Sequence, residues 1–395
     1  MKLKTKSLVA STLGLALAWT ATAGADDIEL PRSIAMTAYG TGSAGYTQMA
    51  ALGNHLQNNY GTSVRILPGE NDVARMTPLK TGRVPLCSCG IASYYGAEGV
   101  FMFSGPDWGP QDIRVIATSQ ANFGLGLAVA GDIDVETPAD LEGKRIAYIR
   151  GDDALNVGTE AFLAFGGLTW DDVERVEFPG YGRSFEGIIG NQADAAFTMT
   201  VAPPAQQLAA SPRGITWPHL DPDDSEAWER FQEVAPYFQP HHVTVAAGGH
   251  DEDNPWIGAS YPYPILVANR DADEGMVRNL LRVLIEDNDQ YKDAAPGLAG
   301  WSLDNQNMQW VIPFHEAAVE YYKETGHWTD DMQEHQDMLV ERHRTIRIAW
   351  GNYVSEDPPR DEDEFKQGWR EARAAALEDI GMDPIFHCAR SVNPM

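Results

Sequence analysis

A glycine-rich turn near the start of the chain has the spacing of an anion-binding site. The segment Gly40–Gly45 (GTGSAG) matches the pattern G-x-G-x-x-G, follows a predicted strand and opens a predicted helix. Exposed N–H groups at a helix start bind phosphates or carboxylates, and the hydroxyls of Thr41 and Ser43 add donors. Three hypotheses remain open: a cradle for a small anion, a helix-capping turn, and a dinucleotide site with Glu70 near the end of the next strand.

A second glycine turn, Gly151-Asp152-Asp153, precedes another predicted helix. Two such turns in two α/β units suggest a cleft in which both helix starts face one ligand. Arg75, Arg150 and Arg183 each adjoin a candidate loop. We expect one arginine at most to touch an anionic ligand and the others to form surface salt bridges.

Catalytic and metal-binding patterns are sparse. His315-Glu316 lacks the second histidine of H-E-x-x-H, and the chain has no G-x-S-x-G elbow. His241, His242 and His335 lack metal-ligand partners, so we interpret them as surface or capping residues. We therefore predict no catalytic residue, no metal and no cofactor.

The chain has three cysteines, Cys87, Cys89 and Cys388. Cys87 and Cys89 are two apart, so on a strand their side chains point the same way. Two hypotheses stay open: a long-range bridge to Cys388 that ties the tail to the N-terminal unit, and three unpaired core or loop residues.

Strands alternate with helices over the first half of the chain, which indicates a parallel α/β sheet. The predicted elements of the first unit are strands 33–39, 63–67, 85–88, 113–119 and 125–130 and helices 44–59 and 72–80. The second unit starts at Thr137-Pro138, with strands 145–150, 173–178 and 193–198 and helices 154–165, 184–190 and one opened by Pro203. Beyond residue 271 the pattern is helical, with a last helix over 362–377.

The first 25 residues have the order of a secretory signal peptide. A basic start is followed by the apolar run 7–19 and by Ala23-Gly24-Ala25. The alternative is a membrane anchor, but a span needs ~20 apolar residues. We expect cleavage after Ala25, a periplasmic location and a mature chain of 370 residues, which is long enough for two lobes. Export disfavours the dinucleotide hypothesis, because nicotinamide cofactors are cytoplasmic.

The chain is acidic. Its net charge is −28, and loss of the signal peptide with its three lysines makes it −31. A field of this sign disfavours nucleic acid and anionic membranes as partners. Because the acids are scattered, we interpret them as a solvated surface suited to high external salt rather than as an acidic ligand-binding surface.

Several motifs, taken in order behind the signal peptide, resemble one family of receptors. They are GTGSAG at 40–45, RMTPLKTG at 75–82, AEGV at 97–100, PADLEGK at 138–144, GGLTWDDV at 166–173, NQADAAF at 191–197 and YPYP at 261–264. This order is similar to that of the TAXI family, the solute receptors of TRAP transporters. The resemblance covers nearly the whole mature chain.

The resemblance implies an α/β, two-lobed, periplasmic binding protein-like (type II-like) fold, with crossing strands between the lobes and a helical C-terminal region. The implied domains are a signal peptide at 1–25, lobe I at 26–130 plus 262–395, and lobe II at 131–261. It also implies a small organic solute, a carboxylate or amino acid such as glutamate or 2-oxoglutarate, and the permease subunits of a TRAP transporter as partners. By position, the ligand-binding residues are Gly42, Ser43, Tyr46, Asn71, Asp72, Arg75, Gly151, Asp152, Asn156, Thr159, Thr198, Thr200, Tyr261 and Tyr263.

Two features depart from the family pattern. Cys87-Ser88-Cys89 replaces more ordinary strand residues beside the cleft, and Asp152 and Asp153 replace the small residues of the second turn. An acid there repels a carboxylate unless it is paired. The sequence thus predicts a receptor that closes on its solute, with Tyr261 and Tyr263 packing on the solute's apolar part. The alternatives are a secreted two-lobe enzyme that acts on a small anion and an exported sensor subunit.

Overall fold

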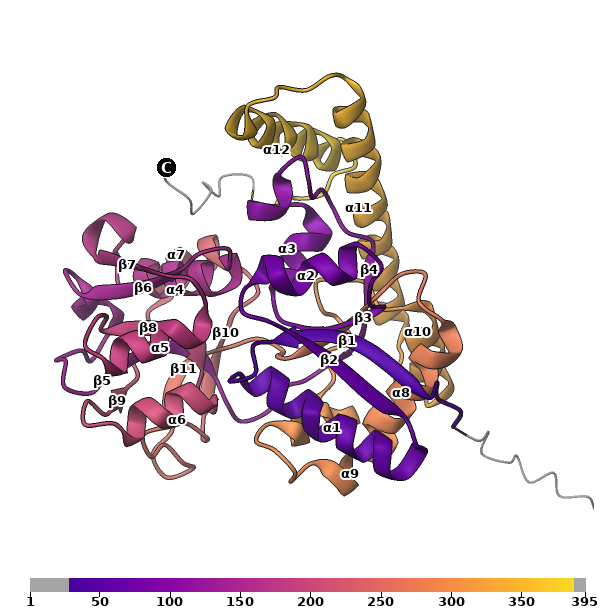
Figure 1. Cartoon of the computed structure of the whole chain (residues 1–395). Coiled ribbons are helices and arrows are strands. Elements are labelled where there is room, and N and C mark those ends of the chain that lie inside the picture. Colours follow the sequence, from indigo (N-terminus) through magenta and orange to yellow (C-terminus); the bar gives the residue numbers. More distant parts are fainter. Residues whose placement is uncertain (1–27, 387–395) are drawn as a thin grey trace, which may run out of the picture.

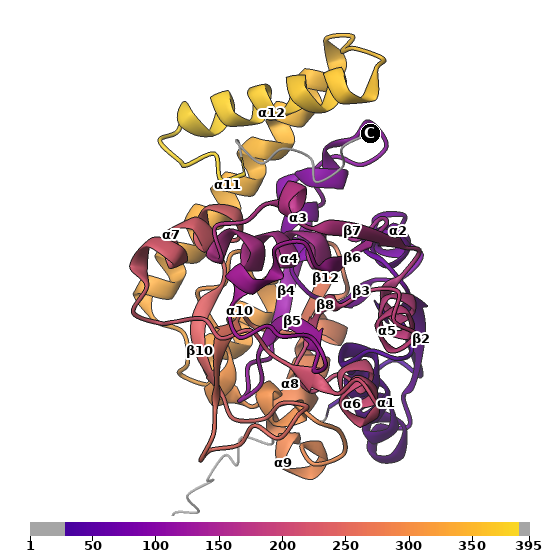
Figure 2. The ribbon, with the colours of Figure 1, turned by 90° about the vertical axis from the view of Figure 1, so that its left-hand side faces the viewer.

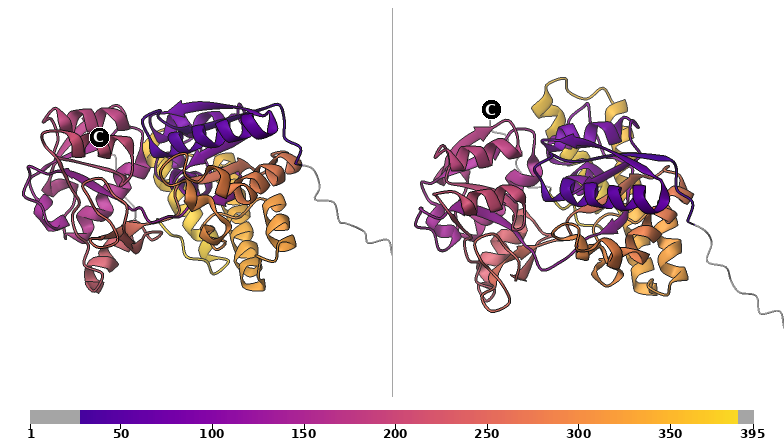
Figure 3. Two further views of the ribbon diagram at one scale, coloured as in Figure 1. Left: turned by 90° about the horizontal axis from the view of Figure 1, so that it is seen from below. Right: turned by 60° about the horizontal axis from the view of Figure 1, so that its bottom comes forward.

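The computed structural model describes residues 28–386, and they form two α/β lobes that lie side by side (Figures 1 and 3). The predicted signal peptide and Cys388 lie outside these residues. Each lobe has its own sheet, and the predicted two-lobed α/β fold class is confirmed. Within residues 28–386, no helix combines the length and apolar character that crossing a bilayer requires.

The first sheet has the strand order β2-β1-β3-β12-β4. Its strands are β1 (Ser33–Tyr39), β2 (Ser63–Gly69), β3 (Leu86–Cys89), β4 (Ile113–Thr118) and β12 (Ile265–Asn269). Helix α1 (Ala44–Tyr60) lies on one side of this sheet, and α2 (Asp72–Lys80) and α3 (Ala92–Glu98) lie on the other (Figure 1).

The second sheet has the order β10-β11-β5-β8-β6-β7, and β9 pairs with β5. Its strands are β5 (Leu125–Ala130), β6 (Arg145–Ile149), β7 (Glu174–Phe178), β8 (Ala195–Met199), β9 (Ile215–Thr216), β10 (Gln239–Val243) and β11 (Trp256–Ser260). Its helices are α4 (Asp153–Phe165), α5 (Tyr181–Ile189), α6 (Pro203–Ala210) and α7 (Ser225–Val234).

Both sheets are mixed, so the prediction of a parallel sheet holds for only part of each: β1 pairs parallel with β2 and β3, and β6 pairs parallel with β7 and β8. β12 runs antiparallel between β3 and β4, and β5 runs antiparallel to β8. The reason is the path of the chain: a strand that returns from the other lobe enters its sheet from the opposite end. β5 belongs to the second sheet, so the chain leaves lobe I after β4, whereas the predicted boundary falls after residue 130.

Two short segments, 119–124 and 261–264, connect the lobes. They are joined to each other, because the amide of Tyr263 donates to the carbonyl of Ser119 (2.6 Å) and the amide of Ser119 donates to that of Pro264 (3.0 Å). A paired crossover of this kind joins the lobes along one edge, the arrangement about which hinge-closing proteins move.

The C-terminal part is helical, as predicted. It comprises α8 (Glu274–Glu286), α9 (Asn288–Tyr291), α10 (Glu316–Glu324), α11 (Asp330–Ser355) and α12 (Glu362–Glu378). The long α11 runs along lobe I, and α12 packs across its end (Figure 2). The buried carboxylate of Glu98 on α3 accepts hydrogen bonds from Arg342 on α11 and Arg373 on α12, which ties these helices to lobe I.

The cysteines adopt neither predicted arrangement. Cys87 and Cys89, on the same face of β3, are bonded to each other. A long-range bridge from either residue to the tail is therefore excluded in this structure.

Candidate functional site

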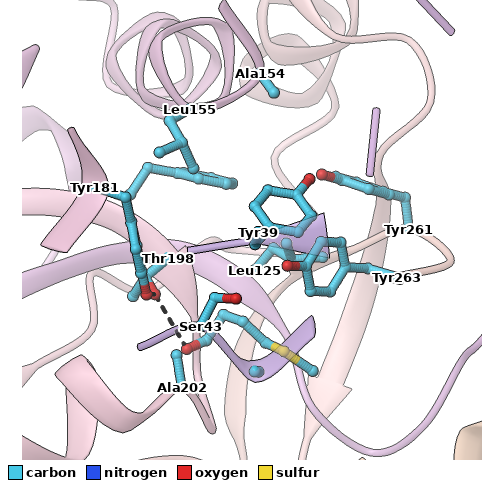
Figure 4. Close-up of a pocket in the computed structure, with 13 residues that line it drawn as sticks. Tyr39, Ser43, Leu125, Ala154, Leu155, Tyr181, Thr198, Ala202, Tyr261 and Tyr263 are labelled. Atoms are coloured by element: carbon cyan, nitrogen blue, oxygen red, sulfur yellow. Dashed lines mark hydrogen bonds between the residues drawn. The ribbon is translucent and has the colours of Figure 1, made fainter. Parts of the chain in front are cut away.

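A small cavity, with about 30 Å³ accessible to water, lies between the lobes (Figure 4). Lobe I supplies the end of β1 and the start of α1, lobe II supplies β5, β8 and the starts of α4, α5 and α6, and the returning crossover supplies two tyrosines. The lining residues are Tyr39, Ser43, Ala44, Leu125, Ala154, Leu155, Tyr181, Phe197, Thr198, Met199, Ala202, Tyr261 and Tyr263. Pockets that hold small solutes are commonly concave, mostly apolar and placed between domains.

The first glycine turn brings α1 to this cavity. Ser43 is the N-cap of α1, and its Oγ accepts a hydrogen bond from the amide of Tyr46 (3.1 Å), so its own O–H remains available to donate. A side chain at Gly45 would place its Cβ 3.1 Å from the Tyr263 hydroxyl and 3.1 Å from the Tyr39 ring. Glycine at this position therefore lets two tyrosines lie against the helix start.

Tyrosines dominate the polar part of the wall. The rings of Tyr39 and Tyr263 are 5.4 Å apart and edge to face, and the Tyr261 ring is 6.4 Å from that of Tyr263. Burial raises the pKa of each of these three tyrosines well above its usual value. Their hydroxyls thus stay neutral and act as hydrogen-bond donors. Across the cavity, the hydroxyls of Tyr181 and Thr198 are 2.6 Å apart.

The second glycine turn brings α4 to the boundary between the lobes, where a carboxylate of lobe I occupies its start. Asp72, at the beginning of α2, accepts a hydrogen bond from the amide of Ala154 (2.8 Å) and forms an ion pair with Arg75. Asp152 is the N-cap of α4 and accepts from the amide of Leu155 (3.0 Å). All three ionisable residues, Asp72, Arg75 and Asp152, are buried, each at most 1% exposed.

The charge of this cluster is nearly balanced. Burial, and then the charge of Asp72, raise the pKa of Asp152 well above its usual value. Burial also raises the pKa of Asp72, but Arg75 and the α4 amide oppose this effect. We therefore assign the negative charge to Asp72 and the proton to Asp152, so that Asp72 and Arg75 cancel.

Arg75 lies one ring away from the cavity. Its guanidinium carbon is 3.6 Å from the centre of the Tyr39 ring, a cation–π contact. Within residues 28–386, its Nε and Nη1 atoms have no hydrogen-bond partner. Of the other two arginines, Arg183 pairs with Glu186 on an exposed face, and Arg150 is exposed.

Further contacts join the lobes around the cavity. Asp153 accepts a hydrogen bond from the amide of Met102 (2.8 Å), and the hydroxyls of Tyr95 and Tyr237 are 2.6 Å apart. Burial raises the pKa of Asp153 to about 7. The structure therefore has the lobes in contact.

The predicted ligand residues fall into three groups. Ser43, Thr198, Tyr261 and Tyr263 line the cavity. Five others, Asn71, Asp72, Arg75, Gly151 and Asp152, form contacts at the boundary between the lobes, including a hydrogen bond from Asn71 to the carbonyl of Arg150.

The residues of the third group form hydrogen bonds within one lobe or face solvent. Asn156 bonds both backbone groups of Ile149, and Thr159 bonds the carbonyl of Leu155. Thr200 bonds Gly124 and Val245. Gly42 is exposed and Tyr46 is half-buried, and neither lines the cavity.

Sequence reasoning missed the apolar wall and two tyrosines. Tyr39 is the last residue of β1 and directly precedes the first glycine turn, so its place at the carboxyl end of a strand was a usable signal. Tyr181, Phe197 and Met199 gave no such signal. No group of three or more histidine, cysteine or acidic side chains suited to a metal ion is found among residues 28–386.

Solved structures with a partial likeness to this chain include three binding proteins. The alkanesulfonate-binding protein SsuA from Xanthomonas axonopodis pv. citri, bound to MOPS, is 14% identical, with 78% of this chain and 95% of that chain covered and a TM-score of 0.38. An amino acid ABC transporter substrate-binding protein from Streptococcus pneumoniae, bound to L-arginine, is 12% identical (68% and 93% covered, TM-score 0.40). A periplasmic binding protein from Brucella ovis with glutathione bound is 10% identical (65% and 69% covered, TM-score 0.41). Likenesses this distant do not indicate a ligand.

A family model gives a firmer result, because it matches well over half of the chain, from residue 36 to residue 326. The matched part contains both sheets, apart from the first three residues of β1, and every residue of the cavity wall. The chain therefore belongs to the NMT1-like family.

Proposed function

We propose that this protein is an extracytoplasmic solute-binding receptor of the TAXI type, which captures a small organic solute between its lobes and delivers it to the permease of a TRAP transporter. The observation that carries the proposal is the cavity between the lobes, whose wall combines both lobes and the crossover. A solute held there contacts both lobes at once, and such contacts favour the closed form over the open one.

The sequence motifs support the finer parts of the proposal. The order of motifs from Gly40 to Pro264 resembles the TAXI family, and the N-terminal pattern predicts export to the periplasm. The lobes we propose are 26–118 with 265–395, and 125–260, joined by the crossovers 119–124 and 261–264; the predicted boundary after residue 130 is moved because β5 belongs to the second sheet. The ligand residues we retain in direct contact are Ser43, Thr198, Tyr261 and Tyr263.

Thermal unfolding of the mature chain, residues 26–395, tests the proposal. The panel contains small mono- and dicarboxylates, amino acids and nucleotides, at moderate and high salt. A ligand at 100 times its Kd adds about 2.7 kcal/mol to the free energy of unfolding, which is a clear rise in Tm. Small-angle X-ray scattering of the same sample then reports whether the lobes close.

A receptor is supported by one or a few solutes that raise Tm, bind with a stoichiometry of one and are recovered unchanged. Chemical conversion of the bound compound indicates the secreted enzyme instead. If only nucleotides raise Tm, the first glycine turn is better explained as a dinucleotide site, and the proposal of a solute receptor is contradicted.

A further inference from the structure

The two helix starts at the boundary between the lobes offer different amounts of room to an anion. At α1, Ser43 and Ala44 lie in the cavity wall. At α4, the carboxylate of Asp72 already accepts the amide of Ala154. A ligand carboxylate can therefore be placed at α1, where the helix N-terminus and the Ser43 hydroxyl favour it.

The rest of the cavity wall offers no oppositely charged side chain to a second charged group on the solute. Among the described residues, none of the thirteen that line the cavity carries a formal charge. Their hydroxyls belong to serine, threonine and tyrosine, and the remaining positions are alanine, leucine, phenylalanine and methionine. A second carboxylate or an ammonium group enclosed there would lose its hydration without gaining an ion pair.

The charged residues nearest the cavity lie outside its wall, although the Nε and Nη1 atoms of Arg75 have no hydrogen-bond partner among residues 28–386. Asp72 and Arg75 form an ion pair, Asp152 caps α4, and Arg75 lies against the Tyr39 ring rather than in the wall. This arrangement leaves no acid to accept an ammonium group and no basic side chain to pair with a second carboxylate in the cavity itself.

Most of the side chains in the cavity wall are apolar or aromatic. Leu125, Phe197 and Met199 line the cavity from lobe II. The rings of Tyr39, Tyr261 and Tyr263 lie together on one side of the cavity, and Tyr181 lies on the other (Figure 4). Such a wall gains free energy by covering an apolar body.

From these observations we infer that the solute of this receptor is a monocarboxylate with an apolar, aromatic or branched body, rather than a dicarboxylate or an amino acid. The inference rests on the proposed function, and it narrows the solute class that the sequence resemblance implies. The carboxylate lies at the start of α1, beside Ser43 and the tyrosine hydroxyls, and the apolar body lies against β8 and the start of α4.

Isothermal titration calorimetry with a matched series of compounds tests this inference. The series is 3-phenylpropanoate, L-phenylalanine (which adds an ammonium group), phenylsuccinate (which adds a carboxylate) and 3-phenylpropan-1-ol (which removes the carboxylate). 4-Methylpentanoate, glutamate and 2-oxoglutarate are measured beside them. We expect 3-phenylpropanoate or 4-methylpentanoate to bind at least tenfold more tightly than every compound with a second charge and than the alcohol.

The inference is overturned if phenylsuccinate, glutamate or 2-oxoglutarate binds more tightly than both monocarboxylates. The proposed receptor function is not affected by that result. The same holds if the alcohol binds as tightly as 3-phenylpropanoate, because no carboxylate site is then needed. Absence of binding by every compound in the series and in the thermal panel overturns both the inference and the proposed function.

A pair of variants at Leu155 supplies an independent check. Leu155 is partly exposed, lines the cavity and lies in the first turn of α4, so a longer side chain has room there. Leu155→Arg adds the missing cation and should shift the affinity ratio of phenylsuccinate to 3-phenylpropanoate at least tenfold toward phenylsuccinate. Leu155→Met is the matched control and should leave that ratio unchanged. An unchanged ratio in folded Leu155→Arg contradicts the inference.

Discussion

The starts of α1 and α4 have similar sequences but different roles in the structure. Each helix follows a strand and a glycine turn, and each has a side-chain N-cap, Ser43 in α1 and Asp152 in α4. Both starts border the cavity, but at α4 the amide of Ala154 already donates to Asp72 from the other lobe. The comparison shows that one anion-binding geometry serves either a ligand or the closure of the protein, depending on what the facing lobe provides.

The acid in the second turn also has a physical reason. Asp152 would repel a ligand carboxylate, as the sequence indicated, but in the structure it caps α4 beside the Asp72–Arg75 pair and carries a raised pKa. The departure from the pattern of the TAXI receptors that the sequence resembles thus belongs to the contact between the lobes rather than to the wall of the cavity.

The largest expected effect comes from removing the carboxylate at α4. Asp72→Ala leaves Arg75 buried without its partner and the amide of Ala154 without its acceptor. Loss of one partner of a buried ion pair costs about 3–5 kcal/mol, so we expect a loss of this size in urea unfolding of the mature chain.

The matched control is Glu186→Ala, which breaks the exposed pair between Arg183 and Glu186. An exposed pair contributes about 0–1 kcal/mol, so this variant should unfold close to the wild type. If Asp72→Ala is equally mild, the α4 start does not depend on Asp72 and the comparison fails.

A smaller effect concerns pH. Asp153 has a pKa of about 7 in the folded protein, raised by burial, against about 3.9 in an unfolded chain. The folded state therefore binds more protons between these values, and stability falls as pH rises from about 4 to 7 and levels off above 7. In the wild type this carboxyl should lower the free energy of unfolding by up to ~1.4 kcal/mol per pH unit over that range. Asp153→Asn should abolish this contribution, which urea unfolding at pH 5, 6 and 7 measures.

The amide oxygen that Asp153→Asn introduces can still accept from Met102, so the variant keeps the contact between the lobes that Asp153 makes. Equal pH slopes for wild type and Asp153→Asn would show that another group carries the dependence. The carboxyls of Asp72 and Asp152 are the first to examine, because burial raises their pKa values too.

The smallest effect separates a cap from a ligand contact. Ser43→Ala should cost about 1 kcal/mol of stability through loss of the α1 cap and weaken the best-bound solute about three- to tenfold. Thr329→Ala removes the N-cap of α11, far along the chain from the cavity wall, and should cost a similar stability with no change in affinity. Equal effects of both variants on affinity would mean that Ser43 acts only as a cap.

Much of the fold was predictable because its signals are local. The predicted strand 33–39 and the predicted helix over 72–80 have the bounds seen in the structure, since strand periodicity, caps and glycine stops all act over a few residues. The strands β10, β11 and β12 were missed, because their short runs show no clear alternation.

The site was less predictable, because it depends on pairs of groups from different lobes. Ser43 and Tyr263 could be placed near the cavity from the glycine turn and the crossover. That Asp72 occupies the start of α4 follows only from how lobe I meets lobe II, which no local pattern encodes. The mixed sheets have the same origin, since they depend on where the chain returns from the other lobe.

The central claim is that one solute bridges both lobes at this cavity. Hydrogen–deuterium exchange of the mature chain, with and without the panel compound that raises Tm most, tests it directly. We predict simultaneous slowing of exchange in segments 39–46 of lobe I, 154–155 and 197–202 of lobe II, and 261–263 of the crossover. Slowing confined to one lobe, or to a surface away from these segments, would contradict the account.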